Sequence, residues 1–275
     1  MRCAWNELIS ILPMWMRDDV DRLGRVDLQE LRLRLGQQAE LVCGTKQVHL
    51  DQSIRQDDLH FVINTASRYS PWTAQTTAYG FITAPGGHRI GLCGEAVVQN
   101  GIMTGIRRTD SLCIRVARDF PGIAIKAKGF HGSILIIGPP GSGKTTLLRD
   151  LIRQRGTQGT VSVVDERGEI FPQGFYRGMN TDVLTGVGKE AGIDCVIRTM
   201  NPNTVAVDEI TSETDCFALS KACWCGVSLL ATAHAGSVQE FKRRSVYAPL
   251  VQSRIFEHVI VLSRDKSWHM EGMDS

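Results

Sequence analysis

A lysine and two threonines follow a glycine-rich turn in the stretch ILIIGPPGSGKTTLLRD, from Ile134 to Asp150. Residues 138–145 match the pattern G-x-x-x-x-G-K-[ST] in full. In such a loop, backbone N–H groups converge on phosphate oxygens, the lysine reaches the outer phosphates, and the threonine hydroxyl faces Mg²⁺. The stretch therefore predicts a site for the phosphates of ATP with Mg²⁺. The expected binding residues are Gly138, Pro139, Pro140, Gly141, Ser142, Gly143, Lys144, Thr145 and Thr146.

Two acidic residues end the apolar run TVAVDE, from Thr204 to Glu209. Phosphoryl transfer to water needs a second group near the metal and a residue that orients the attacking water. We expect Asp208 to hold Mg²⁺ together with Thr145, and Glu209 to polarise the water as the catalytic base. The alternative is a strand that simply ends in a solvated acidic turn.

Two more segments place polar side chains after apolar runs. SVVDERGE ends in Asp165, Glu166 and Glu169, and LLATAHAG places His234 just beyond its run. Because strand ends in open α/β sheets face the ligand crevice, we expect the carboxylates to reach Mg²⁺ or water and His234 to reach the terminal phosphate. Glu166 and His234 thus join Glu209 as candidate catalytic residues. Exposed loop charges and a capping histidine are the alternatives.

The elements that would position these residues lie after residue 125. Near-continuous apolar runs separated by helical segments are typical of parallel strands buried on both faces. The helix expected after the glycine-rich loop carries an apolar stripe. We therefore expect residues 126–275 to form a doubly wound α/β domain with a parallel sheet. The runs are SILIIG, TVSVVD, NTVAVDE and VSLLATAH, and the stripe comprises Leu147, Leu148, Leu151 and Ile152.

Residues 1–125 follow a different pattern, that of a smaller α+β domain. Leu31 and Leu33 alternate with arginines, as in a strand with one solvated face, and residues 54–69 have helical spacing. Gly86-Gly87 and Asn100-Gly101 predict two hairpin turns. The connector that follows is broken by Pro121, Gly122, Gly129 and Gly132.

Composition limits the partners. The chain has 31 basic and 29 acidic residues, a net charge of +2, so binding to nucleic acid is not expected without a local basic patch. No run of about eighteen uncharged apolar residues is present, so we expect membrane contact to be peripheral and through partners. Eight cysteines lie scattered in apolar stretches. We expect reduced core thiols, because no second pair stands at zinc-ligand spacing.

Together these segments resemble one family. ELRLRLG, YGFITAPGGHRIGLCGEAV, IRVAR, GPPGSGKTTLLRDL, VVDERGEI, VIRTMNPNTVAVDEI and ATAHAG match in order the pattern of the stage III sporulation protein AA family. That family is similar to type II and type IV secretion ATPases. The resemblance implies a RecA-like ATPase domain, and it identifies the segments containing Glu166, Asp208 and His234 as the acidic, Walker B and histidine boxes.

The resemblance also implies a location and an assembly. Such a protein is expected in the cytoplasm of the mother cell of a sporulating bacterium, peripherally associated with the membrane proteins of a channel complex that joins mother cell and forespore. Secretion ATPases are generally hexameric, which implies that an arginine of one subunit completes a neighbour's site. Arg107, Arg108, Arg115 and Arg118 are the candidates, and the choice among them stays open.

One departure from the secretion ATPases is Thr211, which stands where they usually have an arginine, so the role of that arginine is not carried over. Two other functions compete with a secretion-like motor. A nucleic-acid-binding ATPase is disfavoured by the near-neutral charge. A nucleotide-gated scaffold that scarcely hydrolyses ATP is disfavoured by Glu209.

Overall fold

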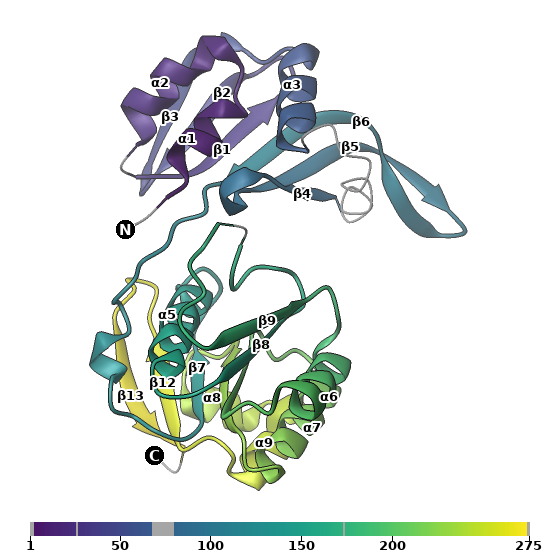
Figure 1. Cartoon of the computed structure of the whole chain (residues 1–275). Coiled ribbons are helices and arrows are strands. Elements are labelled where there is room, and N and C mark those ends of the chain that lie inside the picture. The colour runs from purple at the N-terminus through teal and green to yellow at the C-terminus, as the bar shows by residue number, and fades with distance from the viewer. Residues whose placement is uncertain (1–2, 26, 68–79, 173, 274–275) are drawn as a thin grey trace. The chain divides into compact units, whose positions relative to one another are not determined.

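A computed structural model describes residues 3–25, 27–67, 80–172 and 174–273. The chain divides into two compact units, Met1–Asp119 with Pro172–Phe175, and Phe120–Phe171 with Tyr176–Ser275 (Figure 1). The first unit ends at Asp119, whereas the sequence pattern placed the boundary near residue 125. The reason is local, since the Asp150 carboxylate accepts hydrogen bonds from the backbone N–H of Gly122 (2.9 Å) and Ala124 (2.8 Å), which ties the connector to the second unit.

The first unit contains a six-stranded antiparallel sheet in the order β3-β2-β1-β6-β5-β4. Its strands β5 and β6 form a long ribbon (Figure 1). The strands are β1 (Leu28–Arg34), β2 (Gln38–Cys43), β3 (Lys46–Ser53), β4 (Phe81–Thr83), β5 (Arg89–Gln99) and β6 (Ile102–Arg115). The described helices are α1 (Trp5–Ser10), α2 (Met14–Gly24) and α3 (Gln56–Ala66), with a 3₁₀ turn η2 (Pro85–Gly87).

Alternation along β1 separates a core face from a solvated face. Leu31 and Leu33 are buried with residues of all three helices, whereas Arg32 and Arg34 pair on the other face with Glu30 and Glu40. The expected strand is confirmed, as are the two hairpin turns, at 85–87 and at Asn100-Gly101. The helix expected over 54–69 is present as the shorter α3, Gln56–Ala66, and residues 68 and 69 of the expected range lie outside the described part of the chain.

The second unit is built on a seven-stranded sheet in the order β13-β12-β7-β11-β10-β8-β9. All neighbouring strands are parallel except β13, which pairs antiparallel with β12. The sheet is therefore mixed, and the expectation of a purely parallel sheet was wrong at this edge. The strands are β7 (Ile134–Ile137), β8 (Val161–Asp165), β9 (Thr181–Thr185), β10 (Thr204–Val207), β11 (Ser228–Ala233), β12 (His258–Leu262) and β13 (Trp268–Gly272).

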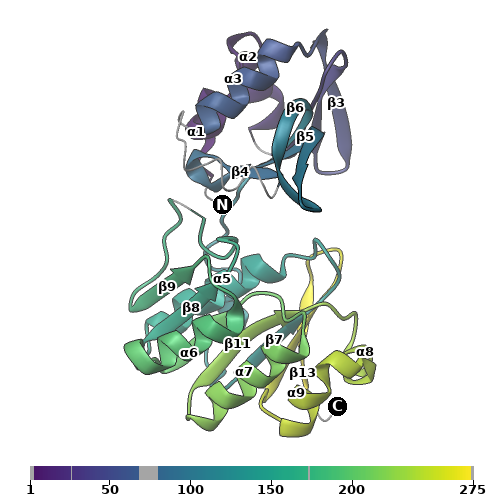
Figure 2. The ribbon, with the colours of Figure 1, turned by 90° about the vertical axis from the view of Figure 1, so that its right-hand side faces the viewer.

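Helices cover both faces of this sheet, with α6 and α7 on the near side and α5 on the far side (Figure 2). The four buried strands were predicted from their apolar runs, and each of them is a strand in the structure. The helices are α5 (Lys144–Gly156), α6 (Lys189–Met200), α7 (Glu213–Trp224), α8 (Val238–Arg243) and α9 (Ala248–Ser253), with 3₁₀ turns η3 (Ile125–Ala127) and η4 (Ser245–Tyr247).

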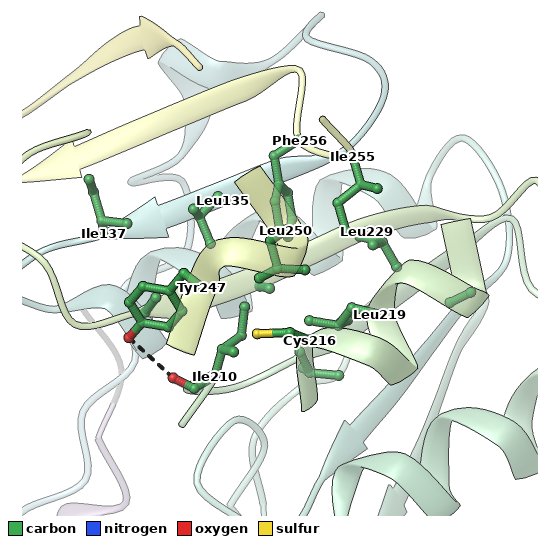
Figure 3. Packing of buried hydrophobic residues seen from close by; sticks show 14 of the residues in the cluster. Leu135, Ile137, Ile210, Cys216, Leu219, Leu229, Tyr247, Leu250, Ile255 and Phe256 are labelled. Atoms are coloured by element: carbon green, nitrogen blue, oxygen red, sulfur yellow. Dashed lines mark hydrogen bonds between the residues drawn. The ribbon is translucent and has the colours of Figure 1, made fainter. Parts of the chain in front are cut away.

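The largest hydrophobic core lies between the sheet and helices α6, α7 and α9. Leu135 and Leu229 of the sheet pack there with Leu219 of α7 and Leu250 of α9 (Figure 3). The Tyr247 hydroxyl at the edge of this core donates a hydrogen bond to the Ile210 carbonyl (3.4 Å). The apolar stripe on α5 is buried on the opposite face of the sheet, so the loop before α5 is anchored by packing at both of its ends.

All eight cysteines are unpaired, as expected, but they are not all core residues. Cys216 of α7 is buried, whereas Cys93 and Cys225 are exposed. Burial raises the pKa of the Cys216 thiol to about 12, which makes it unreactive.

Across the described residues, no helix combines the length and the apolar composition needed to cross a bilayer.

Candidate functional site: a phosphate loop facing two strand ends

The loop from Gly138 to Gly143 connects the end of β7 to the start of α5. Gly141 and Gly143 have φ angles of +72° and +102°, in the region that favours glycine. Gly138 has no room for a side chain, since a Cβ there would lie 2.7 Å from Ser142 Oγ and 2.8 Å from the carbonyl oxygen of Leu262. The loop therefore needs its glycines for both conformation and space, and it ends at the positive end of a 13-residue helix.

Lys144 is almost buried, with 7% of its surface exposed, and its ammonium group is fully engaged. Nζ donates to the carbonyls of Gly138 (2.9 Å) and Pro139 (3.1 Å) and lies 3.0 Å from His234 Nδ1. Burial lowers the pKa of the Lys144 amine from its ordinary value, while the carboxylates of Glu209 and Asp208 act in the opposite direction. The three protons of the ammonium thus point at three acceptors in or beside the loop.

Asp208 and Glu209 follow β10 and face the start of α5. Thr145 Oγ1 donates to Asp208 Oδ2 (3.1 Å), and Thr232 Oγ1, from β11, donates to Asp208 Oδ1 (2.8 Å). The backbone N–H of Glu209 donates to Thr232 Oγ1 (2.9 Å) and to Asp208 Oδ1 (2.9 Å). Parallel pairing of β10 with β11 brings these residues together, because both strands end at the same edge of the sheet.

His234 links the loop lysine to Glu209. Its Nε2 lies 2.8 Å from Glu209 Oε1, while Nδ1 faces Lys144. With Nδ1 accepting from the ammonium, the neutral imidazole carries its proton on Nε2 and donates it to the carboxylate. Residues expected separately from three motifs, Lys144, Glu209 and His234, therefore form one chain of contacts.

The acidic segment after β8 divides into two parts. Asp165 is only 1% exposed, and its carboxylate accepts the backbone N–H groups of Glu169 (2.8 Å), Ile170 (2.9 Å) and Phe171 (3.1 Å). Burial raises its pKa, against these hydrogen bonds. Asp165 lines the pocket at the strand ends, while its carboxylate is held by these three backbone N–H groups of the following loop. That it reaches Mg²⁺ or water stays a prediction.

Glu166 and Glu169 line the same pocket, together with Asp208 and Glu209. Glu166 Oε2 accepts from Lys189 Nζ (3.1 Å), at the start of α6, and Lys189 also lies 3.9 Å from Asp215 Oδ2. Thr211, at the position of the arginine of secretion ATPases, lines the same pocket and donates its backbone N–H to Asp215 Oδ2 (2.9 Å). Thr211 is thus part of the cap of α7, in which Ser212 Oγ also accepts the backbone N–H of Asp215 (3.1 Å).

The four candidate arginines belong to the first unit, with Arg107 and Arg108 in the middle of β6, Arg115 at its end and Arg118 just after it. Arg107 pairs with Glu95, and Arg108 Nε lies 3.2 Å from Asp110 Oδ1. Arg118 donates twice to the Leu28 carbonyl (2.9 and 3.1 Å). Arg115 is the least restrained, since its side chain is 71% exposed and its ion-pair partner, Glu30 Oε2, is 3.9 Å away.

The residues of the loop and of the strand ends fit a nucleotide with a metal ion. Ser142 Oγ is buried in the loop without a hydrogen-bond partner among the described residues, which leaves this hydroxyl available to a bound ligand. Thr145 and Asp208 offer a hydroxyl and a carboxylate, the oxygen ligands that Mg²⁺ prefers.

Two residues of the site, Thr232 and Lys189, were not predicted from the sequence. Thr232 lies two residues before His234, so the alternation of a strand ending in that histidine was the available signal.

The fold is that of the secretion ATPases. DotB from Legionella pneumophila superposes with a TM-score of 0.62 at 15% sequence identity, covering 94% of this chain and 79% of that one. The pilus retraction motor PilT, whose structure holds ADP, gives a TM-score of 0.61 at 13% identity, covering 89% of this chain and 76% of that one. At these identities the likeness concerns the fold.

The sequence shows which family the chain belongs to. The chain belongs to the family described as Sporulation stage III, protein AA, whose sequence profile matches residues 6–273. Stage III sporulation protein AA of Bacillus subtilis (strain 168) is 34% identical over 282 residues, covering 95% of this chain and 92% of that protein. The family resemblance expected from the motifs is confirmed.

Proposed function

We propose that this chain is a Mg²⁺-dependent ATP hydrolase with a RecA-like core. The observation that carries the proposal is the convergence of Lys144 and Thr145, at the start of α5, with Asp208, Glu209 and His234 from the ends of two neighbouring strands. A nucleotide-binding loop alone fits a scaffold. A buried lysine linked through an imidazole to a carboxylate fits a site that acts on the terminal phosphate.

Each residue has a distinct role in this proposal. The backbone of residues 138–146 holds the phosphates, and Thr145 and Asp208 hold Mg²⁺, which neutralises charge on the phosphate oxygens when bound. Glu209 orients water and takes its proton. The terminal phosphate competes with His234 for the protons of Lys144, so ATP binding releases His234 from Lys144 and changes the hydrogen bonding of Glu209. Glu166 is held by Lys189 and serves as a secondary carboxylate.

The assembly is proposed to be a ring, with six subunits as in other secretion ATPases, in which an arginine of the first unit reaches a neighbour's phosphates. Arg115 is preferred over Arg108 because its side chain is exposed and weakly paired. The family points to a role in sporulation, on a membrane channel complex between mother cell and forespore, with the protein on the cytoplasmic side in the mother cell.

Nucleotide binding tests the site directly. We expect the protein to bind ATP in the presence of Mg²⁺ and Lys144→Ala to weaken binding about tenfold to a hundredfold, because one charged hydrogen-bond donor to phosphate is removed. Titration calorimetry measures the affinity, and far-UV circular dichroism checks that the variant is folded. Lys126→Ala, an exposed lysine of the same unit, is the matched control. Equal affinity of folded Lys144→Ala and the native chain would remove the assignment.

A further inference from the structure

The turn between β12 and β13, residues 263–267, lies beside the phosphate loop because of the sheet register. Strand β12 pairs in parallel with β7, with Val261 opposite Ile137, so both strands end at the same edge. Leu262 follows Val261, and Gly138 follows Ile137. A Cβ on Gly138 would lie 2.8 Å from the Leu262 carbonyl oxygen. The turn is therefore a fixed neighbour of the loop.

This turn is closed by its own hydrogen bonds. The backbone N–H of Ser263 donates to the Ser267 carbonyl (2.9 Å), and that of Lys266 donates to the Ser263 carbonyl (3.2 Å). The Asp265 carboxylate accepts from the backbone N–H (3.0 Å) and the hydroxyl (2.6 Å) of Ser267. These bonds determine where the side chain of Lys266 leaves the backbone.

Lys266 occupies a conformation that its residue type disfavours. Its φ angle is +73°, where glycine or asparagine fits with less strain. A lysine held in this region points to a requirement for its side chain, since strained residues gather at functional sites.

The side chain of Lys266 extends over the phosphate loop. Its ammonium group donates a hydrogen bond to the Gly141 carbonyl, and its Cδ lies 4.0 Å from where a Cβ on Gly143 would be. In the described part of the chain this carbonyl is its one hydrogen-bond partner, whereas Lys144 has three. A carbonyl leaves most of the ammonium charge uncompensated, so an exposed cation stands at the mouth of a loop suited to anions.

We propose that Lys266 is a second phosphate-binding lysine of the same chain, which exchanges the Gly141 carbonyl for phosphate oxygens of a nucleoside triphosphate. The inference rests on the proposed nucleotide site and adds a contact from outside the glycine-rich motif. A nucleoside triphosphate carries more negative charge than Lys144 and Mg²⁺ together neutralise. Lysine acts here as a mobile point charge on a flexible stem, which suits exchange between two oxygen partners.

The test compares two neutral substitutions in one turn. Lys266→Asn removes the ammonium and keeps a residue that tolerates the left-handed backbone, so the turn is expected to stay folded. Arg264→Asn removes an equal charge from an exposed residue of the same turn. Calorimetry with ATP and Mg²⁺ is expected to show about tenfold weaker binding for Lys266→Asn and a change of less than about twofold for Arg264→Asn. Lys266→Arg is expected to retain most of the affinity.

The results separate this inference from the proposed function. If Lys144→Ala loses affinity while Lys266→Asn binds ATP like the native chain, the second lysine is rejected and the nucleotide site stands. If both asparagine variants lose affinity equally, a diffuse charge effect replaces the contact, and the inference is also rejected. If neither lysine matters, the nucleotide site itself is rejected. A melting temperature within about 2 °C of the native value, measured for each variant, excludes unfolding as the cause.

Discussion

At the residue scale, the site is a chain of polar contacts that a phosphate group is suited to break. Lys144 directs its protons at two loop carbonyls and His234, and His234 contacts Glu209. Phosphate oxygens are stronger acceptors for an ammonium group than imidazole or carbonyl groups are, because they carry full negative charge. Nucleotide binding and the state of the carboxylate are thereby linked through one histidine.

Removing the carboxylate separates binding from hydrolysis. Glu209→Gln keeps the size of the side chain but cannot take a proton, so we expect near-native ATP affinity with hydrolysis slower by about a hundredfold, within the range for loss of a general base. Phosphate release measures the rate, and calorimetry measures the affinity. Glu166→Gln is the comparison, since Glu166 lines the same pocket but is paired with Lys189. Near-normal turnover by Glu209→Gln together with a large loss in Glu166→Gln would reverse the two roles.

At the scale of single elements, His88, between η2 and β5, joins segments that are distant in sequence. The ring is fully buried, with Nε2 2.9 Å from the Ala4 carbonyl and Nδ1 accepting the backbone N–H of Ala117 (3.1 Å). The imidazole is therefore neutral, with its proton on Nε2. Burial lowers the pKa of His88, with a smaller effect of Arg118 in the same direction, while the Ala4 carbonyl and Glu7 oppose it.

Burial of the neutral His88 ring makes the stability of the folded chain depend on pH. Because the pKa of His88 is lower in the folded chain than the value of about 6.5 expected when unfolded, the unfolded chain takes up a proton first as the pH falls. The contribution of His88 is complete above about pH 6.5 and is lost as the pH falls towards the folded-state pKa. Urea unfolding of the native chain between pH 7.5 and 5 is expected to show this loss.

The control for this effect is His88→Gln, whose amide can donate and accept like the neutral ring but does not titrate. Its free energy of unfolding is expected to change less between pH 7.5 and 5. Exposed His60 provides the comparison, and His60→Gln is expected to keep the native pH dependence. If His88→Gln and the native chain lose stability in parallel, burial of the neutral ring is not the cause.

The elements that sequence patterns predicted are those with strong local periodicity. The runs that became β7, β8, β10 and β11 are buried at every position except the first residue of β11, and such continuous apolar runs are visible in the sequence. The edge strands β9 and β13 carry polar side chains at alternate or exposed positions, so their pairing depends on neighbouring strands more than on composition. Helix α1 has six residues, too few to show a periodic pattern.

Site residues divide in the same way. Lys144, Thr145, Asp208, Glu209 and His234 were predicted because each stands at a fixed offset from a motif, and the structure brings them together. Asp165 lines the pocket with the other acidic residues, but the three backbone N–H groups downstream that its carboxylate accepts could not be predicted from the motif. Lys266 was missed because only the parallel register of β12 and β7 brings its turn to the phosphate loop.

At the scale of the whole molecule, the proposal requires more than one chain. A transferred phosphoryl group gains charge that a further cation stabilises, and an arginine supplied by a neighbouring subunit can contribute about 10³-fold or more in rate. Arg115 lies in the first unit, whereas the phosphate loop belongs to the second, and the Arg115 side chain is exposed. Lys266 offers a cation within the same subunit, so the two residues predict different dependences on assembly.

Mixing two inactive variants distinguishes these sources. Lys144→Ala lacks a working phosphate loop but keeps its arginines, whereas Arg115→Ala has the loop but not the arginine. If Arg115 acts on a neighbour, each variant alone is expected to hydrolyse ATP slowly and an equal mixture to recover part of the native rate. Arg32→Ala, on the same sheet face, is the control and is expected to be active alone. Native activity of Arg115→Ala would move the role to another arginine or to Lys266.

The central claim, that this chain hydrolyses ATP at the site built by α5, β10 and β11, is tested most directly by phosphate release from ATP. The native chain and Lys144→Ala are measured side by side at equal concentration, with Mg²⁺ and with a chelator. We expect steady phosphate release by the native chain, which stops when Mg²⁺ is removed and is absent in Lys144→Ala. Release that survives in Lys144→Ala, or no release by the native chain at any protein concentration at which it binds ATP, would contradict it.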